Sequence, residues 1–163
     1  MDTPYYCILP SPLGDLLLVA QGAALRDLHI LSGKFVPDIG SNWQQNAQHP
    51  VLQQAAQELG EYFAGQRQVF SVALAPQGTA FQQAAWAALL QIPYGKTISY
   101  GQQARNMGKP KAVRAVGGAN GKNPISIIIP CHRVLGANGA LTGYSGGMAH
   151  KVFLLQHEGA LLA

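Results

Sequence analysis

Residues 127–134 of the chain read IIIPCHRV, so a cysteine, a histidine and an arginine follow an apolar run. A cysteine attacks as its thiolate, and an unperturbed thiol, with a pKa of about 8.5, is only slightly ionised at neutral pH. A base beside Cys131 would raise the ionised fraction. His132 is adjacent in sequence and reaches the thiol through a turn or a bridging water. These residues indicate a nucleophilic cysteine; the alternative is a buried cysteine beside a surface His-Arg pair.

Glu158 is the only acidic residue after position 78. It falls in the last turn of a helix predicted for residues 145–159, where the helix dipole disfavours a carboxylate. Ser145 is expected to cap this helix and Gly159 to end it. The side chains expected to face inward are Met148, Val152 and Leu155. A carboxylate in this setting is expected to have a specific partner, and His132 is the candidate. A solvated glutamate at a helix end is the alternative.

The segments that lead to and from Cys131 can be predicted from their apolar residues and turns. Ile127–Ile129 predicts a short buried strand, because β-branched residues favour strands and Pro130 cannot continue one. Asn138-Gly139 predicts a hairpin over residues 134–141. Upstream, Thr79 is expected to cap a helix that runs to about Gln91.

Two shorter helices with a glycine turn between them precede the isoleucine run. Ser99 is expected to cap the first, residues 100–107, and Pro110 to start the second, which runs to about Ala119. Gly108-Lys109 forms the turn, so the pattern is that of a helix-turn-helix, and the later hairpin would be its wing. The second helix carries Lys111 and Arg114 and then small residues, which suit contact with a nucleic-acid backbone. A buried helical hairpin is the alternative.

Charge divides the chain into two parts. Residues 1–78 hold three basic and six acidic side chains, a net charge of −3, whereas residues 79–163 hold eight basic and one acidic, a net charge of +7. A basic module of this kind favours a polyanionic partner, although a basic surface without a partner remains open. Cys7 and Cys131 are the only cysteines, which favours a reducing, cytoplasmic location. No signal peptide, membrane span or metal site is expected; His29 and His49 lack neighbouring ligands.

The acidic part predicts a small sheet and one helix. Apolar runs at 5–9, 16–20 and 24–31 alternate with turn residues, which predicts an antiparallel meander. Residues 31–48 are expected to form a loop, Pro50 to start a helix that Gly65 ends, and residues 69–74 to form one more strand. We therefore expect an α/β (α+β) chain with domains at residues 1–75 and 76–163, the second mostly helical with a winged helix-turn-helix.

The chain resembles the O6-alkylguanine-DNA alkyltransferases, strongly over residues 79–159 and more weakly at residues 11–14. The pentapeptide at 130–134 is similar to the active-site signature of that family. The other matching segments, in the order and spacing of the family, are residues 92–95, 99–101, 112–117, 123–124, 144–147 and 157–159. The resemblance implies a stand-alone bacterial member whose N-terminal domain is ribonuclease H-like.

The resemblance implies a direct transfer of the alkyl group from guanine O6, and by extension thymine O4, to Cys131, once per molecule. His132 would act as base through a water, Glu158 would orient His132, and Asn123 would hold the turn. Tyr100 would give a proton to the guanine ring. The implied contacts with the flipped base are Tyr144, the Ser145 N–H with Gly146 beside it, and the backbone of Cys131 and Val134.

The resemblance also implies how the chain meets DNA. Arg114 would fill the space that the flipped nucleotide leaves, and the recognition helix would lie in the minor groove of duplex DNA that contains an alkylated guanine. The residues implied in DNA contact are Tyr100, Lys111, Arg114, Ala115, Gly117 and Gly118. No cofactor is expected. No zinc is expected either, because some relatives bind zinc in the N-terminal domain through two cysteines and two histidines, and this chain has Cys7 alone. A monomer is expected, with cooperative binding along DNA left open.

Two other functions compete with the transferase. A lesion-binding module would bind alkylated duplex and leave Cys131 unmodified. A cysteine hydrolase would use Cys131, His132 and Glu158 on an acyl substrate, would turn over many times and would not need a basic helix-turn-helix. From the residues alone, a reactive thiol beside a DNA-binding surface is indicated, and the lesion is named only by the resemblance.

Overall fold

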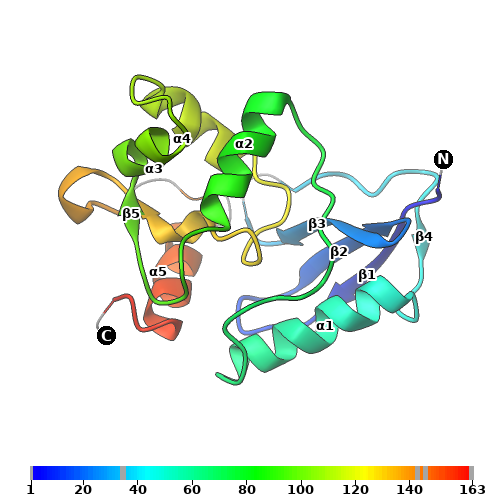
Figure 1. Ribbon diagram of the computed structural model, residues 1–163. Coiled ribbons are helices and arrows are strands. Elements are labelled where there is room, and N and C mark those ends of the chain that lie inside the picture. Colours follow the sequence, from blue (N-terminus) through cyan, green and yellow to red (C-terminus); the bar gives the residue numbers. More distant parts are fainter. Residues whose placement is uncertain (1, 34–35, 142–143, 145–146, 162–163) are drawn as a thin grey trace. The chain divides into compact units, whose positions relative to one another are not determined.

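The computed structural model describes residues 2–33, 36–141, 144 and 147–161, and it divides into two compact units, residues 1–76 and 77–163 (Figure 1). Among the residues described, the first unit holds four strands and one helix, and the second holds the remaining elements. Each unit is described below by itself. Within the described residues, no helix is both long and apolar enough to span a membrane.

The first unit is built on a sheet whose strand order is β3-β2-β1-β4. Strands β1 (Tyr5–Leu9), β2 (Leu16–Gln21) and β3 (Ala24–Ile30) form the predicted antiparallel meander. The side chains of residues 16–20 are buried, which gives the sheet its apolar centre. The sheet is mixed and not antiparallel throughout, because β4 (Gln44–Gln45) pairs in parallel with β1. This strand lies in the segment predicted to be a loop, and its two polar residues carry no strand pattern.

Helix α1 (Pro50–Phe63) packs its apolar face on the sheet and begins with proline in its first turn, as predicted. Four apolar residues of this face are buried: Leu52, Ala55, Leu59 and Tyr62. Gly65 has a φ of +76°, a conformation that glycine adopts without a steric penalty. Its N–H donates to the carbonyl oxygen of Tyr62, which closes the helix.

Residues 69–74 do not form the predicted strand; within this segment only Leu74 pairs, in a single parallel bridge with Leu25. The reason is a buried carboxylate on α1. Glu58 Oε1 accepts the backbone N–H groups of Ser71, at 2.8 Å, and Val72, at 3.1 Å. These donors are satisfied by a side chain, so the alternating sequence does not need a neighbouring strand.

The second unit begins with α2 (Ala80–Leu89), where Thr79 and Gln82 form a complete capping box. Ser99 caps α3 (Tyr100–Asn106), as predicted, and Gly108 turns the chain with a φ of +72°. Helix α4 (Val113–Gly121) starts three residues later than predicted and ends two later. Pro110 and Lys111 lie in the turn instead, because the Ala112 N–H bonds to the carbonyl oxygen of Lys109.

A buried amide pair fixes α3 against α4. Gln103 Nε2 donates to Asn120 Oδ1 at 3.0 Å, and Asn120 Nδ2 donates back to Gln103 Oε1 at 2.8 Å. Gln103 also donates to the carbonyl oxygen of Ala85 on α2. Trp86 Nε1, also on α2, donates to the carbonyl oxygen of Ala119 at 2.9 Å. Because every bond in this network is buried, the angle between the two helices is tightly specified.

The last part of the unit carries a short parallel pair, a turn and a helix. Strand β5 (Ile98–Ser99) pairs with β6 (Val134–Leu135). Asn138 and Gly139 have positive φ values in the 3-10 segment η2 (Ala137–Gly139), and the Gly136 N–H bonds to the Ala140 oxygen at 2.7 Å. The predicted turn therefore forms, although no strand follows it in residues 140, 141 or 144.

Helix α5 (Met148–His157) starts after Gly147, which is its N-cap, and Gly159 follows it with a φ of +75°. Ser145, predicted to be the cap, lies outside the described residues. Met148 was predicted to face inward, but it is 37% exposed because it is the first residue of the helix. The buried positions of α5 are Lys151, Leu154 and Leu155.

Candidate active site and nucleic-acid interface

The chain approaches Cys131 through a tight turn and not through the predicted strand. Ile127–Ile129 are buried, but they form turns, and Ile127 has a φ of +72°. This conformation costs a β-branched residue about 1–3 kcal/mol and persists only where its surroundings enforce it. The backbone hydrogen bonds around Ile127 lie within the turn itself: the Ile128 N–H donates to the Ser126 oxygen and the Ile129 N–H to the Ile125 oxygen. The isoleucines fill the core without pairing with a strand.

Asn123 organises this turn and contacts the thiol. Its Oδ1 accepts the Ile125 N–H at 3.0 Å, and its Nδ2 donates both to the Ile129 oxygen, at 2.8 Å, and to Cys131 Sγ, at 3.3 Å. Asn123 is itself buried. One amide therefore sets the shape of the turn and supplies a donor that favours negative charge on the sulfur.

Cys131 begins a single 3-10 turn, η1 (Cys131–Arg133), and is only 6% exposed. Burial raises the pKa of the Cys131 thiol, and this is the largest effect on it. The Asn123 hydrogen bond and the positive charge of Lys151 act in the opposite direction. The resting thiol is therefore largely protonated, with two groups in place that favour its thiolate.

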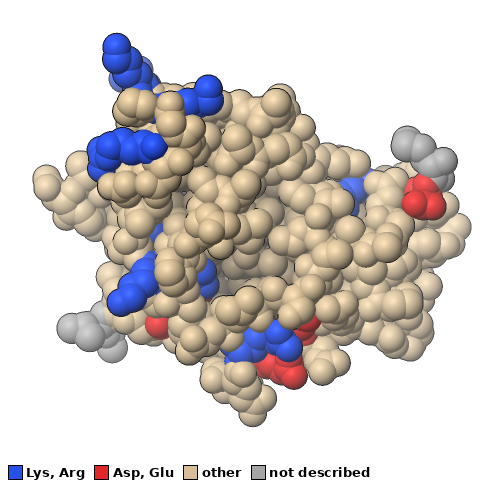
Figure 2. Space-filling model, in the orientation of Figure 1, with Lys and Arg blue, Asp and Glu red and all other residues tan. Residues whose placement is uncertain are grey.

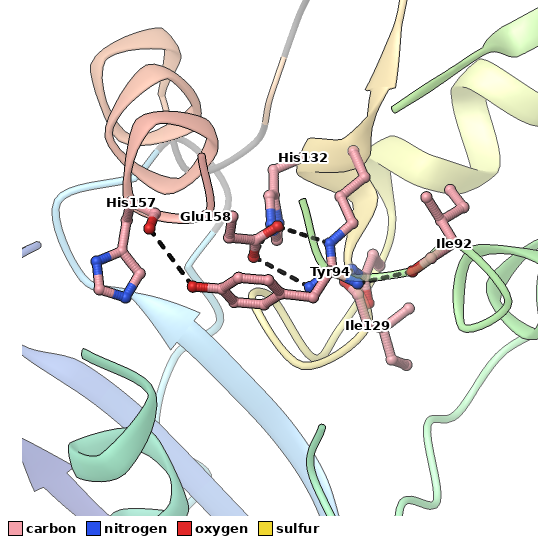
Figure 3. A network of polar contacts seen from close by, with 8 residues as sticks. Ile92, Tyr94, Ile129, His132, His157 and Glu158 are labelled. Atoms are coloured by element: carbon pink, nitrogen blue, oxygen red, sulfur yellow. Dashed lines mark hydrogen bonds and ion pairs between the residues drawn. The ribbon is translucent and has the colours of Figure 1, made fainter. Parts of the chain in front are cut away.

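Glu158 lies at the centre of a buried polar cluster beside this turn (Figure 3). His132 Nε2 is 2.8 Å from Glu158 Oε2, so the structure brings together the two residues that the sequence analysis paired. Arg133 holds the same carboxylate with two bonds, from Nε to Oε1 at 2.8 Å and from Nη2 to Oε2 at 3.0 Å. Its Nη1 donates to the Ile92 oxygen at 2.7 Å. The turn η1 is thereby fixed to the end of α5.

Arg133 is not the surface residue that the plainer interpretation of the His-Arg pair assumed, since it is only 7% exposed. Sequence reasoning gave Arg133 no role. The available signal was Glu158, because a single acid in a basic module has a cation as its natural partner. The bidentate contact places that cation next to His132.

His132 has one ring nitrogen committed to Glu158. Burial lowers the pKa of His132 more than the Glu158 hydrogen bond raises it, so the ring is neutral at pH 7. A neutral ring next to a carboxylate donates its Nε2–H, which leaves Nδ1 as the acceptor. Among the described residues no group hydrogen-bonds to Nδ1. Nδ1 is therefore the ring nitrogen that is available to accept a hydrogen bond.

The other residues implied in base contact lie partly within the described chain. Tyr144 is buried, and burial raises the pKa of its phenol well above the ordinary value, so it stays neutral. Val134 is buried in β6, and its carbonyl oxygen accepts a 2.8 Å bond from Lys151 Nζ. Ser145 and Gly146 lie outside the described residues.

The helix-turn-helix presents small and basic residues at its surface. Lys111, Arg114, Ala115 and Gly118 are exposed, while Val116 and Ala119 on the opposite side of α4 are buried. A side-chain carbon added at Gly117 would lie 3.9 Å from the ring of Tyr100, so α3 and α4 approach closely there. Figure 2 shows lysine and arginine side chains projecting from the part of the unit that carries α3 and α4. This surface suits a polyanion.

Both units match known family profiles. Residues 4–76 match the ribonuclease-like domain of 6-O-methylguanine DNA methyltransferase, and residues 80–160 match the DNA-binding domain of the same protein. These matches confirm the family resemblance that was based on the sequence motifs. They also confirm the predicted fold class.

Individual relatives give the same result over nearly the whole chain. A methylated-DNA–protein-cysteine methyltransferase from Methanosarcina acetivorans is 48% identical over 96% of this chain and 99% of its own length. A protein of the same name from Haemophilus influenzae is 46% identical, over 97% of this chain and 88% of its own. The crystal structure of Mycobacterium tuberculosis OGT in complex with DNA superimposes with a TM-score of 0.87 at 46% identity, covering 96% of this chain and 93% of that one.

Proposed function

Because this chain belongs to the 6-O-methylguanine DNA methyltransferase family, we propose that it repairs duplex DNA by moving the alkyl group of O6-alkylguanine onto Cys131. The observation that carries the assignment of residues is the buried turn in which Asn123 bonds to the Cys131 sulfur. Beside that sulfur, His132 is held by Glu158 and is neutral. These contacts support a site in which Cys131 is the nucleophile, His132 the base and Glu158 the residue that orients the base.

The reaction proposed is a single displacement. Cys131 loses its proton, through one water, to Nδ1 of His132, and the sulfur electron pair attacks the alkyl carbon. The bond from that carbon to guanine O6 breaks, and its electron pair stays on the base. Tyr100 gives its hydroxyl proton to a ring nitrogen of guanine, which makes the base a better leaving group. The thioether formed on Cys131 is stable, so each molecule acts once and needs no cofactor.

The partner proposed is double-stranded DNA that contains O6-alkylguanine or, by the same chemistry, O4-alkylthymine. A relative with the same fold has been crystallised with DNA, and the exposed basic residues of the helix-turn-helix support the same contact here. In this proposal the protein binds as a monomer, and α4 enters the minor groove. Lys111 would contact the phosphate backbone, and the small residues of α4, Ala115, Gly117 and Gly118, would lie close to the DNA.

The target nucleotide is proposed to rotate out of the helix into the site beside Cys131. Tyr144 would flank the base, the Ser145 N–H and Gly146 would lie near O6, and the carbonyls of Cys131 and Val134 would accept from the exocyclic amine. Base flipping costs a few kcal/mol, and less for a poorly paired base. Arg114, exposed near the start of α4, would occupy the space left in the duplex.

Replacement of Arg114 by alanine tests this role. We expect Arg114→Ala to slow the repair of an O6-methylguanine duplex by roughly tenfold to a hundredfold, since each 1.4 kcal/mol lost in stabilising the flipped state is a factor of ten. The reaction with free O6-benzylguanine, which needs no flipping, should stay close to the wild-type rate. Single-turnover rates with both substrates give the comparison.

Lys122→Ala is the matched control for Arg114→Ala. Lys122 is also exposed and basic, but it lies at the C-cap of α4, beyond the predicted contact. It should lose far less duplex repair than Arg114→Ala. Equal losses on duplex and free base in the Arg114 variant would contradict the proposed role of Arg114.

A further inference from the structure

Residues 92–95 form the bend that follows α2, and they lie against the buried cluster around Glu158. This segment is one of those that match the family, and the reaction proposed above gives it no role. Its first residue contacts the cluster directly, because the Ile92 carbonyl oxygen accepts the 2.7 Å bond from Arg133 Nη1. Two further residues of the segment, Tyr94 and Gly95, reach the same cluster.

The ring of Tyr94 packs on the guanidinium group of Arg133. The guanidinium carbon is 5.8 Å from the ring centre, within the distance at which the face of an aromatic ring attracts a cation. Tyr94 is half-buried, whereas Arg133 and Glu158 beneath it are buried. The ring therefore forms an outer layer over the ion pair. Because opposite charges attract more strongly where water is excluded, this layer strengthens the hold of Arg133 on Glu158.

The same segment contacts the end of α5, where Glu158 lies. The Tyr94 hydroxyl points to this end and donates a 3.4 Å bond to the carbonyl oxygen of His157 (Figure 3). Gly95 has a φ of +78°, and a side-chain carbon added there would lie 3.1 Å from the Glu158 carbonyl oxygen. Burial raises the pKa of the Tyr94 phenol, and the negative charge of Glu158 raises it further. Tyr94 therefore lies close to both charges of the ion pair.

We propose that Tyr94 is a positioning residue of the alkyl transfer, which acts on the base through Arg133 and Glu158. The inference rests on the proposed function, in which His132 is that base. With the ring in place, the Glu158 carboxylate is held by Arg133 on one side and by the end of α5 on the other. Without the ring, water would reach the guanidinium and compete for its N–H groups. The carboxylate, and the imidazole that it orients, would then lose their fixed position.

The ring of Tyr94, and not its hydroxyl, is expected to carry this effect. The 3.4 Å bond to the His157 oxygen is much longer than the about 2.7–2.8 Å usual for a hydroxyl donor, so it is weak. Tyr94→Phe keeps the ring and should react with free O6-benzylguanine at nearly the wild-type rate. Tyr94→Leu removes the ring and should lower the maximal single-turnover rate on the order of tenfold, because a displaced catalytic group reacts poorly.

The concentration dependence of this reaction separates positioning from substrate binding. In Tyr94→Leu, the O6-benzylguanine concentration that gives half the maximal rate should stay close to the wild-type value, since Tyr94 is not among the proposed base contacts. Repair of an O6-methylguanine duplex should fall by the same factor as the reaction with the free base. This result would differ from that expected for Arg114→Ala, in which only the duplex reaction is slow.

Phe153→Leu is the matched control. Phe153 is also half-buried near the end of α5, but its ring stacks on the side chain of His157, with 6.0 Å between the ring centres. Its loss should leave the maximal rate unchanged. A double mutant tests the route of the effect. In Glu158→Gln, under conditions where it is folded, the further change Tyr94→Leu should slow transfer much less than tenfold, because the group through which Tyr94 acts has already gone.

The wild-type maximal rate in Tyr94→Leu would overturn this inference. It would also fail if Phe153→Leu or Tyr94→Phe lost as much as Tyr94→Leu, or if the tenfold loss persisted in the Glu158→Gln background. Should Tyr94→Leu not fold, Tyr94→Met, which also lacks the ring, replaces it with the same expected and contrary results. A wild-type protein that takes no alkyl group from guanine would overturn the proposed function together with this inference, whereas a reactive wild type matched by Tyr94→Leu would overturn this inference alone.

Discussion

Cys131→Ser should abolish repair, lowering alkyl transfer from O6-methylguanine duplex by at least about a thousandfold, the scale on which a nucleophile contributes. A serine hydroxyl at this position has nearly the volume of the thiol, so the buried turn and its Asn123 contact can persist. The hydroxyl is far less acidic than a thiol and a weaker nucleophile, so the proposed base cannot activate it to the same extent. Affinity for the lesion duplex should remain close to that of the wild-type protein. Transfer of a labelled methyl group to protein, measured beside duplex affinity, tests both expectations.

Cys7→Ala is the matched control, because Cys7 is the other free, buried cysteine of the chain. It lies on β1 in the first unit, and burial raises the pKa of its thiol as well. Its loss should leave the number of methyl groups transferred per molecule unchanged. Transfer that survives in Cys131→Ser and disappears in Cys7→Ala would mean that the nucleophile has been assigned to the wrong cysteine.

Glu158→Gln should damage both stability and transfer. The substitution removes the carboxylate that holds the buried Arg133 guanidinium and His132. Breaking a buried pair by removing one partner costs about 3–5 kcal/mol, because the remaining charge stays buried. The glutamine amide nitrogen is also a donor, and it would face the donors of Arg133 or His132. Urea unfolding of the wild-type and variant proteins at neutral pH measures the loss.

The same substitution should slow transfer on the order of a hundredfold or more under conditions where the variant is folded, because His132 loses the negative charge that orients it and stabilises its protonated form. Glu61→Gln is the control: Glu61 also pairs with an arginine, Arg67, but this pair is at the surface and contributes little to stability. If Glu158→Gln unfolded at the same urea concentration as Glu61→Gln and kept the wild-type rate, the buried cluster would have neither of the roles assigned to it.

Local chemistry was enough to predict most of the helices. Thr79, Ser99 and Pro50 begin helices because capping and the first-turn preference of proline act over a few residues. Gly65 and Gly108 turn the chain for a similarly local reason, since each has a positive φ. The predicted meander also formed, because the apolar runs of β1, β2 and β3 are separated by short turns.

Two of the wrong predictions, the strands expected at residues 69–74 and 127–129, share one cause, which is a polar side chain outside the segment that bonds to its backbone. Residues 69–74 have the sequence pattern of a strand. However, Glu58, which lies on α1 and 13 positions before Ser71, accepts the N–H groups of Ser71 and Val72. The isoleucine run has strong β-propensity, but the Asn123 amide draws it into a turn with Ile127 at positive φ. Propensity describes a residue and its neighbours, so it cannot anticipate a side chain that satisfies the backbone from another element.

Some residues of the site could be predicted from the sequence, and others could not. The pairing of His132 with Glu158 could be argued from an isolated acid near a helix end, and the two side chains do meet across 26 positions. Arg133 was missed, because its burial is decided by packing and not by its type. The residues alone left a hydrolase open. The family was indicated only by the combination of many short motifs, and the matches over residues 4–76 and 80–160 confirm it.

The most direct test of the central claim is intact and peptide mass analysis of the protein after mixing with duplex DNA that carries one O6-methylguanine. We predict one added methyl group per molecule, located on the peptide that contains Cys131, and repair that stops when lesions and protein molecules have reacted one to one. Tight binding to the lesion with Cys131 unmodified would instead mean a lesion-binding module. Turnover beyond one lesion per molecule, or a methyl group on any other residue, would contradict the mechanism proposed for this site.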